Sequence, residues 1–216
     1  MKKLFLIVCL YAGLSARAQF SWGVQGGVNI SDPNISADLH FVGEMAAGFQ
    51  AGVFMQMRLF KSIYFRPAVQ FINKSYKLKP AEYFYSMSPF NAKYSFNYIS
   101  IPLLVTYQPK ISGGNLAFGL GPDLNFAVSG KGNLQVNEYG GISNEEHKLK
   151  FGKSESDEFR SFVIHALLFA GYQSNKGLGI HLFGSPIYSY ISSSEYSNAL
   201  GTYGVSLTYL VGRNNK

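Results

Sequence analysis

The sequence predicts an all-β fold: an eight-stranded antiparallel up-and-down transmembrane β-barrel with short periplasmic turns and long extracellular loops. Three observations support this prediction: long period-2 segments, connections that alternate in length, and an N-terminal export signal. The clearest segment, residues 20–31, alternates Phe, Trp, Val and Ile with Ser, Gln, Asn and Gly over twelve positions. A soluble sandwich strand is usually about half that length, whereas a tilted strand needs about 9–11 residues to cross a bilayer.

Residues 1–18 have the three parts of a secretory signal peptide. Lys2 and Lys3 precede an apolar run of eleven residues, and a small-x-small site ends at Ala18. Eleven apolar residues are fewer than the roughly 20 that a spanning helix needs. We therefore expect cleavage near Ala18 and a mature chain, residues 19–216, that forms a single barrel domain.

The composition suits a membrane barrel. Only 14% of residues are charged, while the chain holds 15 Tyr and 18 Phe. The signal removes three of the basic residues, which lowers the formal charge from +7 to +4 and argues against nucleic acid as a partner. The only cysteine, Cys9, also leaves with the signal, so no disulfide is expected. The sequence after the signal contains no stretch of 18 uncharged apolar residues, which excludes membrane-spanning helices there.

The second and third strands form a predicted hairpin. Residues 47–59 place Phe, Val, Met and Leu on one face and Gln, Gly and Arg on the other. A three-residue turn leads to residues 63–71, where apolar and polar positions again alternate. Pro67 is unusual within this strand, because proline removes a donor from the hydrogen-bond ladder.

The fourth and fifth strands are predicted over residues 93–107 and 116–128. From Ile99 onward, alternate positions of the fourth strand are apolar, and a connection ending in Gly-Gly follows. The fifth strand alternates Leu, Phe and Val with Ala, Gly, Asp and Asn. Both segments are long enough to cross a bilayer at a tilt.

Residues 129–158 form the longest predicted loop, with six acidic and four lysine residues. A loop of this length is normally functional or disordered. The sixth strand is predicted over residues 159–173; residues 162–172 are apolar on both faces apart from His165, so periodicity alone does not separate a strand from a helix there. A turn precedes the seventh strand, residues 178–190, and the eighth covers residues 200–211.

The connections alternate strictly between long and short, as in outer-membrane barrels. In lipid every backbone polar group needs an internal partner, and among β-structures only a closed barrel provides it. A soluble exported sandwich or a lipocalin-like barrel would alternate too. The outward faces, however, are apolar with hardly a charge, which favours the membrane barrel.

Four segments resemble the PorT-like outer-membrane β-barrel proteins of Bacteroidetes. They are WGVQGGVN (22–29), IYFRPAVQ (63–70), NYISIPLLVTY (97–107) and FGLGPDLNF (118–126). The resemblance implies an eight-stranded barrel in the outer membrane. The family's namesake is associated with a secretion and gliding apparatus, and most members have no assigned role. One departure is the polar tail, residues 212–216, because such barrels usually end in an aromatic residue.

Few charged side chains are predicted to face the lumen. We interpret them, with the amides around them, as a hydrogen-bonded structural network that fills the lumen, since buried charges need partners. The alternative is a proton or ion path. The predicted lumen residues are Arg58, Arg66, Asp123, Gln50, Gln70 and Asn125.

No catalytic, cofactor-binding or metal site is predicted. His181 and Ser185 could share the lumen with Asp123, as in some small barrels that modify lipid A. Positions i and i+4 of a strand, however, are about 13 Å apart, too far for a nucleophile–base hydrogen bond. His40 and His147 lie in predicted loops, and the histidines lack metal-ligand spacing.

The predicted function is structural or binding, with outer-membrane lipid around the barrel and an envelope protein partner at loop 129–158. A merely solvated loop is the equal alternative. Two rival functions remain open: an accessory component of a secretion or gliding machinery, and a lipid A-modifying enzyme. The oligomeric state is not predicted.

Overall fold

The computed structural model describes residues 20–35, 41–80, 90–138, 141–152, 157–191 and 198–211. The predicted signal peptide, His40 and the polar tail lie outside these ranges. No helix in the described ranges is long and apolar enough to span a membrane. Eight long strands carry the fold: β1 (Phe20–Ile35), β2 (Phe41–Phe60), β3 (Ile63–Pro80), β4 (Phe90–Tyr107), β6 (Gly114–Glu138), β10 (Phe162–Ser174), β11 (Leu178–Tyr190) and β12 (Asn198–Val211).

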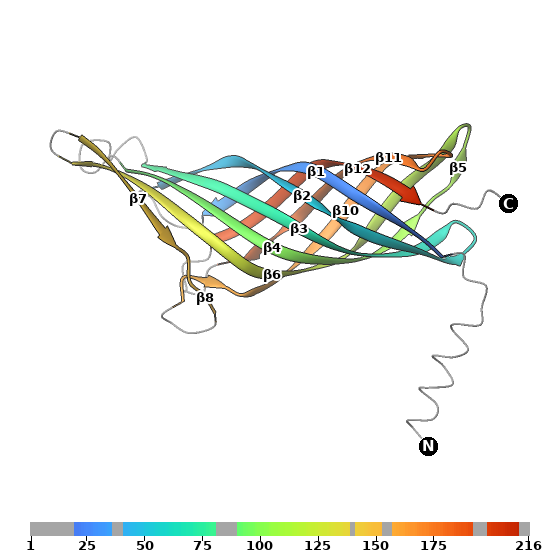
Figure 1. Cartoon of the computed structure of the whole chain (residues 1–216), viewed down its shortest axis with the longest axis horizontal. Helices are drawn as coiled ribbons and strands as arrows, with labels where there is room; N and C mark the ends of the chain where they lie inside the picture. Colours follow the sequence, from blue (N-terminus) through green and yellow to red (C-terminus); the bar gives the residue numbers. More distant parts are fainter. Residues whose placement is uncertain are drawn as a thin grey trace, which may run out of the picture.

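These eight strands form a closed antiparallel ring (Figure 1). The order is β1-β2-β3-β4-β6-β10-β11-β12, and β12 pairs back with β1, with Val211 opposite Trp22. The predicted eight-stranded up-and-down barrel is therefore confirmed. Closure matters because each strand then has hydrogen-bonded neighbours on both sides. The hydrocarbon of a bilayer offers the backbone no such hydrogen-bond partners.

The connections at one end of the barrel are short. A two-residue turn joins β2 to β3, and Lys61 adopts a φ of 41° there. β10 and β11 meet at a turn that ends in Gly177, whose φ is 89°. The two-residue strand β5 (Lys110–Ile111) lies in the connection between β4 and β6. These three turns match the short connections predicted from the sequence.

The opposite end differs from the predicted long loops, because the strands continue past the expected membrane boundary. Residues 129–158, expected to be irregular, are mostly β-structure. β6 extends to Glu138 and pairs with β7 (Gly141–Lys148) in a hairpin that projects beyond the barrel (Figure 1). Backbone pairing with β4 on one side and β7 on the other explains why this charged segment is extended.

The predicted sixth strand is divided in two. β9 (Phe159–Arg160) is separated from β10 at Ser161 and pairs in parallel with β8 (Phe151–Gly152). β10 pairs with β6 on one side and β11 on the other, so this segment is a strand and not a helix. Its apolar inward positions pack into two apolar clusters, Val163 into one and Leu167 and Phe169 into the other.

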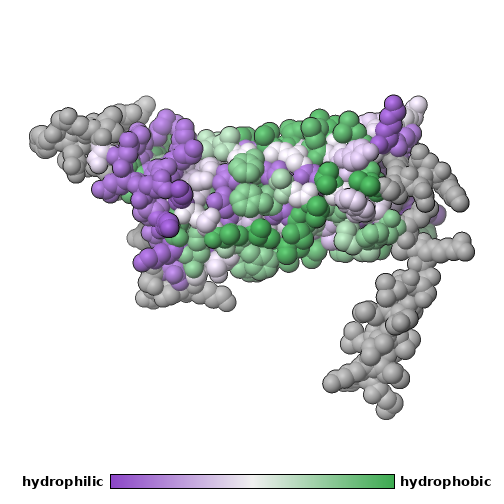
Figure 2. All heavy atoms as spheres, in the orientation of Figure 1, coloured by the Kyte–Doolittle hydropathy of each residue, from purple (hydrophilic) through white to green (hydrophobic). Residues whose placement is uncertain are grey.

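The outer wall of the barrel is apolar. Figure 2 shows green side chains, with white and some purple ones between them, over the middle of the wall, and the largest group of purple side chains at the end that carries β7. The wall residues come from all eight strands and include Val24, Val28, Val53, Val69, Val105, Leu120, Phe126, Ile164, Leu168, Leu182 and Leu207. Such a belt is what a lipid-exposed barrel presents to the bilayer.

The replacement Leu120→Arg tests this belt. Leu120 is 58% exposed on the outer face of β6, so we expect a loss of about 2–4 kcal/mol in unfolding free energy in lipid vesicles. The fluorescence of Trp22, the single tryptophan, reports the transition. Asn133→Arg, on the exposed projecting part of β6, is the control and should cost less than about 0.5 kcal/mol. Equal losses would contradict a lipid-facing Leu120.

Inside the barrel, three phenylalanine rings lie over glycines on neighbouring strands. A Cβ atom at any of these glycines would clash with the opposite ring. The glycines therefore make room for aromatic packing in a narrow lumen. The pairs are Gly23 with Phe54, Gly119 with Phe169 and Gly204 with Phe183.

Candidate functional site

The lumen is filled in layers, and the layer nearest the short turns is made of amides and hydroxyls. Gln56 and Gln108 donate to each other through their side-chain amides at 3.1 and 3.2 Å. Thr208 donates to Oε1 of Gln173 at 3.1 Å, and Nε2 of Gln173 donates to the carbonyl of Gly177. Paired amides thus close this end of the barrel.

The next layer holds Arg66, which is only 4% exposed. Its guanidinium carbon lies 3.9 Å from the ring centre of Phe54 and 5.1 Å from that of Phe169. Nη2 donates to Oε1 of Gln25 at 3.2 Å. The guanidinium is therefore covered by aromatic faces, and its edge points to polar groups.

A directed chain of hydrogen bonds runs from Arg66 to the carboxylate of Asp123. Gln25 accepts from Arg66 and donates to Oε1 of Gln70 at 2.6 Å. Gln70 donates to the hydroxyl of Ser100 at 3.1 Å, and this hydroxyl donates to Oδ1 of Asp123 at 2.5 Å. Every donor in the chain points toward the acid, so the bonds polarise one another and connect the two charges.

Gly52 allows this chain to cross β2. Gln25 lies opposite Gly52 on one side, and Gln70 lies opposite it on the other. A Cβ atom at Gly52 would clash with the side chain of Gln70. The missing side chain therefore lets two amides on non-adjacent strands meet inside the barrel.

The structure brings five of the six predicted lumen residues inside. Arg66, Gln70 and Asp123 share the hydrogen-bond chain, and Asn125 donates from Nδ2 to the backbone carbonyl of Asp123 at 3.1 Å. Gln50 is 6% exposed and lines a cavity in the lumen together with Arg66, Gln70 and Asp123. Arg58 does not lie there: it is exposed, and its Nε donates to the carbonyl of Lys61 at 2.7 Å. Its position beside the turn is a correction to the prediction.

Sequence reasoning missed Lys74, the second buried cation. Lys74 is 2% exposed, and its Nζ lies 5.6 Å from the ring centre of Tyr98. The charge of Asp123 acts on Lys74, and His165 lies opposite Asp123 in the β6–β10 ladder. The signal was present, because Lys74 has the same parity as Arg66 and Gln70 on β3, but the predicted alternation was followed only to residue 71.

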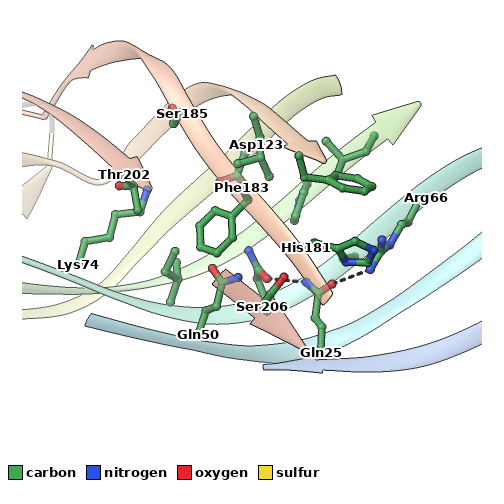
Figure 3. Close-up of a pocket in the computed structure, with 17 residues that line it drawn as sticks. Gln25, Gln50, Arg66, Lys74, Asp123, His181, Phe183, Ser185, Thr202 and Ser206 are labelled. Atoms are coloured by element: carbon green, nitrogen blue, oxygen red, sulfur yellow. Dashed lines mark hydrogen bonds between the residues drawn. The ribbon is translucent and has the colours of Figure 1, made fainter. Parts of the chain in front are cut away.

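His181 and Ser185 both face the lumen from β11 and line the same cavity (Figure 3). Their separation of four residues on one strand corresponds to about 13 Å. Nε2 of His181 has no hydrogen-bond partner among the described residues, and its ring lies 4.9 Å from that of Phe169. His147 instead belongs to β7, with Nε2 3.9 Å from a carboxylate oxygen of Glu158. The described residues contain no group of side chains able to hold a metal ion.

The outer end of the lumen is closed by an apolar cluster, here called the plug. Phe96, which is fully buried, forms its centre, with ring centres 4.8 Å from Phe159 and 5.7 Å from Tyr76. Leu149 and Phe151, which follow the projecting hairpin, pack into it. The plug consists of Ile72, Tyr76, Phe96, Tyr98, Leu149, Phe159, Val163, Ile191 and Leu200, with Phe151 against it.

A cavity of about 40 Å³ remains between the amide layer and the plug. One water molecule needs about 10–15 Å³, so only a few small molecules or ions fit. This cavity, here called the chamber, is lined by both polar and apolar side chains. An eight-stranded barrel is just wide enough for such filling.

Known proteins of similar shape are outer-membrane barrels of different roles. Neisserial surface protein A is 14% identical over 87% of this chain and 96% of its own, with a TM-score of 0.41. Ail of Yersinia pestis, in complex with sucrose octasulfate, is 12% identical over 88% and 98%, with a TM-score of 0.44. The outer membrane protease OmpT of Escherichia coli is 10% identical over 89% and 95%, with a TM-score of 0.38. No curated protein matches the sequence.

The family comparison is more direct. The model of the outer membrane protein beta-barrel domain matches residues 12–190, which is most of the chain. This match agrees with the closed ring of eight strands and with the apolar outer wall. The chain belongs to the outer membrane protein beta-barrel domain family.

Proposed function

We propose that this protein is an integral outer-membrane barrel that binds an envelope protein through its projecting hairpin and performs no catalysis. The observation that carries the proposal is the contrast between a largely filled lumen and a strand-paired, polar projection. The filled lumen leaves little room for a substrate. The projection, by contrast, offers two paired strands beyond the apolar wall (Figures 1 and 2).

The hairpin formed by distal β6 and β7 is held as an extension of the barrel. Lys131 and Glu146 form a cross-strand ion pair at 2.6 Å, and both side chains are about half exposed. The backbone N–H of Leu149 donates to the carbonyl of Gly130 at 3.1 Å, where the hairpin meets the plug. A preorganised hairpin loses less conformational entropy on binding than a flexible loop does.

Among the described strands, β7 pairs only with β6, so its second edge is open. An open edge can accept an extended segment of another protein as an added strand. The exposed side chains nearby are polar: Lys131, Asn133, Gln135, Ser143, Asn144, Glu145, Glu146 and Lys148. They keep the edge soluble while leaving its backbone groups accessible.

The narrower parts of the proposal rest on the sequence. The export signal supports a mature chain beginning near residue 19 in the outer membrane. The PorT-like motifs support a partner that belongs to a secretion or gliding machinery. Mass measurement of the mature protein checks the cleavage near Ala18, and the identity of the partner checks the machinery.

The experiment replaces residues 132–147 by a short turn while keeping Leu149 and Phe151. We expect the variant to fold but to lose the proteins that crosslink to the wild-type barrel in native outer membranes. The double replacement Lys110→Gln and Lys176→Gln, at the opposite end, is the control and should keep them. An unchanged set of crosslinked proteins in the hairpin variant would contradict the proposal.

A further inference from the structure

The chamber holds an unequal number of charges. Arg66 and Lys74 are two cations, and Asp123 is the one acidic side chain among the buried residues that the structure describes. All three are at most 4% exposed. Transferring an ion out of water costs several kcal/mol, which only nearby opposite charge and hydrogen bonds offset. One carboxylate therefore serves two cations.

The charge of Asp123 acts on Lys74, although the two side chains form no ion pair. Arg66 likewise forms no ion pair with a described acidic side chain, and its guanidinium donates to the amide oxygen of Gln25. Arg66 reaches the acid only through the amides of Gln25 and Gln70 and the hydroxyl of Ser100. The two aromatic contacts contribute about 0.5–2 kcal/mol each and carry no negative charge. Arg66 thus lacks a counter-charge in direct contact.

A second donor lies beside Arg66. The charge of Arg66 acts on His181, and Figure 3 shows both side chains at the same end of the cavity. His181 is 2% exposed, and its Nε2 has no partner among the described residues. In the tautomer that carries the proton on Nε2, this atom donates a hydrogen bond. A buried donor without an acceptor costs about 1–3 kcal/mol.

We propose that Arg66 and His181 bind a small monovalent anion, of the size of chloride, inside the chamber. The edge of the guanidinium and the Nε2–H of His181 supply its hydrogen bonds, while Phe54 and Phe169 cover the guanidinium faces. The cavity of about 40 Å³ accepts such an ion but excludes large organic anions. A water molecule satisfies the same donors but leaves the positive charge uncompensated.

The experiment refolds the purified full-length mature barrel in bromide and locates the bromide by anomalous X-ray scattering from crystals. We expect a bromide peak in contact with the Arg66 guanidinium and with Nε2 of His181. Arg66→Met should abolish the peak. His181→Phe keeps a ring against Phe169 but removes the donor, and it should lower the bromide occupancy at least fivefold. Lys176→Met, an exposed cation at a turn, is the control and should leave the occupancy unchanged.

A solution measurement gives the energetic consequence. An anion bound only to the folded barrel raises the unfolding midpoint as its concentration increases. We expect this rise when sodium chloride replaces sodium gluconate at constant ionic strength, and its loss in His181→Phe. Water alone at Arg66 in the bromide crystals, a peak beside Lys74 instead, or the same chloride response in His181→Phe would each overturn the proposal.

Discussion

Replacing Asp123 by alanine is expected to lower the free energy of unfolding by about 3–5 kcal/mol, because it leaves buried cations without their carboxylate. Lys74 loses the acid that acts on it, and Ser100 loses the acceptor that lies 2.5 Å from its hydroxyl. The hydrogen-bond chain from Arg66 then ends without an anion. Denaturant titration in lipid vesicles, followed by the fluorescence of Trp22, measures the loss.

Two further variants separate the charge effect from general damage. Adding Lys74→Met to Asp123→Ala removes the unpaired ammonium and should recover a large part of the lost free energy. Glu146→Gln removes an exposed carboxylate from the Lys131 pair and should cost less than about 1 kcal/mol. If Asp123→Ala cost no more than Glu146→Gln, the chamber would not depend on buried charge compensation.

Phe96→Ala is expected to lower the free energy of unfolding by about 3–5 kcal/mol, because it empties the centre of the plug. Phe96 is fully buried, and its ring contacts those of Tyr76, Tyr98, Phe151 and Phe159 at centre distances of 4.8–6.3 Å. The surrounding rings come from β3, β4 and the segment after β7, so the cavity has little freedom to collapse. Hydrogen exchange of amides near the plug should also accelerate.

Phe126→Ala is the matched control on the outer wall. Phe126 is 43% exposed, and its ring lies tilted against that of Phe162 with centres 4.9 Å apart. Lipid chains can fill the space that its ring leaves, so the loss should be clearly smaller than for Phe96→Ala. Equal losses would indicate that the plug is not a packed core.

Most of the barrel could be predicted from residue alternation, because each strand has one face in lipid and one in the lumen. The same parity correctly pointed Arg66, Gln70 and Asp123 inward. It wrongly placed Arg58 in the lumen. Arg58 lies beside a turn, where the alternation no longer decides which way a side chain points, and its side chain donates to the backbone of Lys61. Parity missed Lys74 because the alternation was followed only to residue 71.

The long strands at the outer end could not be predicted in the same way. A strand outside lipid does not need an apolar face, so the polar and charged residues of β7 carried no alternation signal. Their extended form depends on pairing with neighbours, as where Lys131 lies opposite Lys148 and Ser95. Plug residues such as Leu149 and Phe159 were likewise hidden, since their neighbours come from distant parts of the chain.

The sequence by itself determined the strand faces, the count of eight strands and the apolar belt, because period-2 alternation is a local property. Only the tertiary structure decided which inward residues meet. Gln25 and Gln70 are 45 residues apart, and they touch only because Gly52 lies between them in the closed sheet. The influence of Asp123 on Lys74, and the position of Arg66 beside His181, depend on ring closure and strand register in the same way. Chemistry within the lumen is set by contacts across strands, which no single segment encodes.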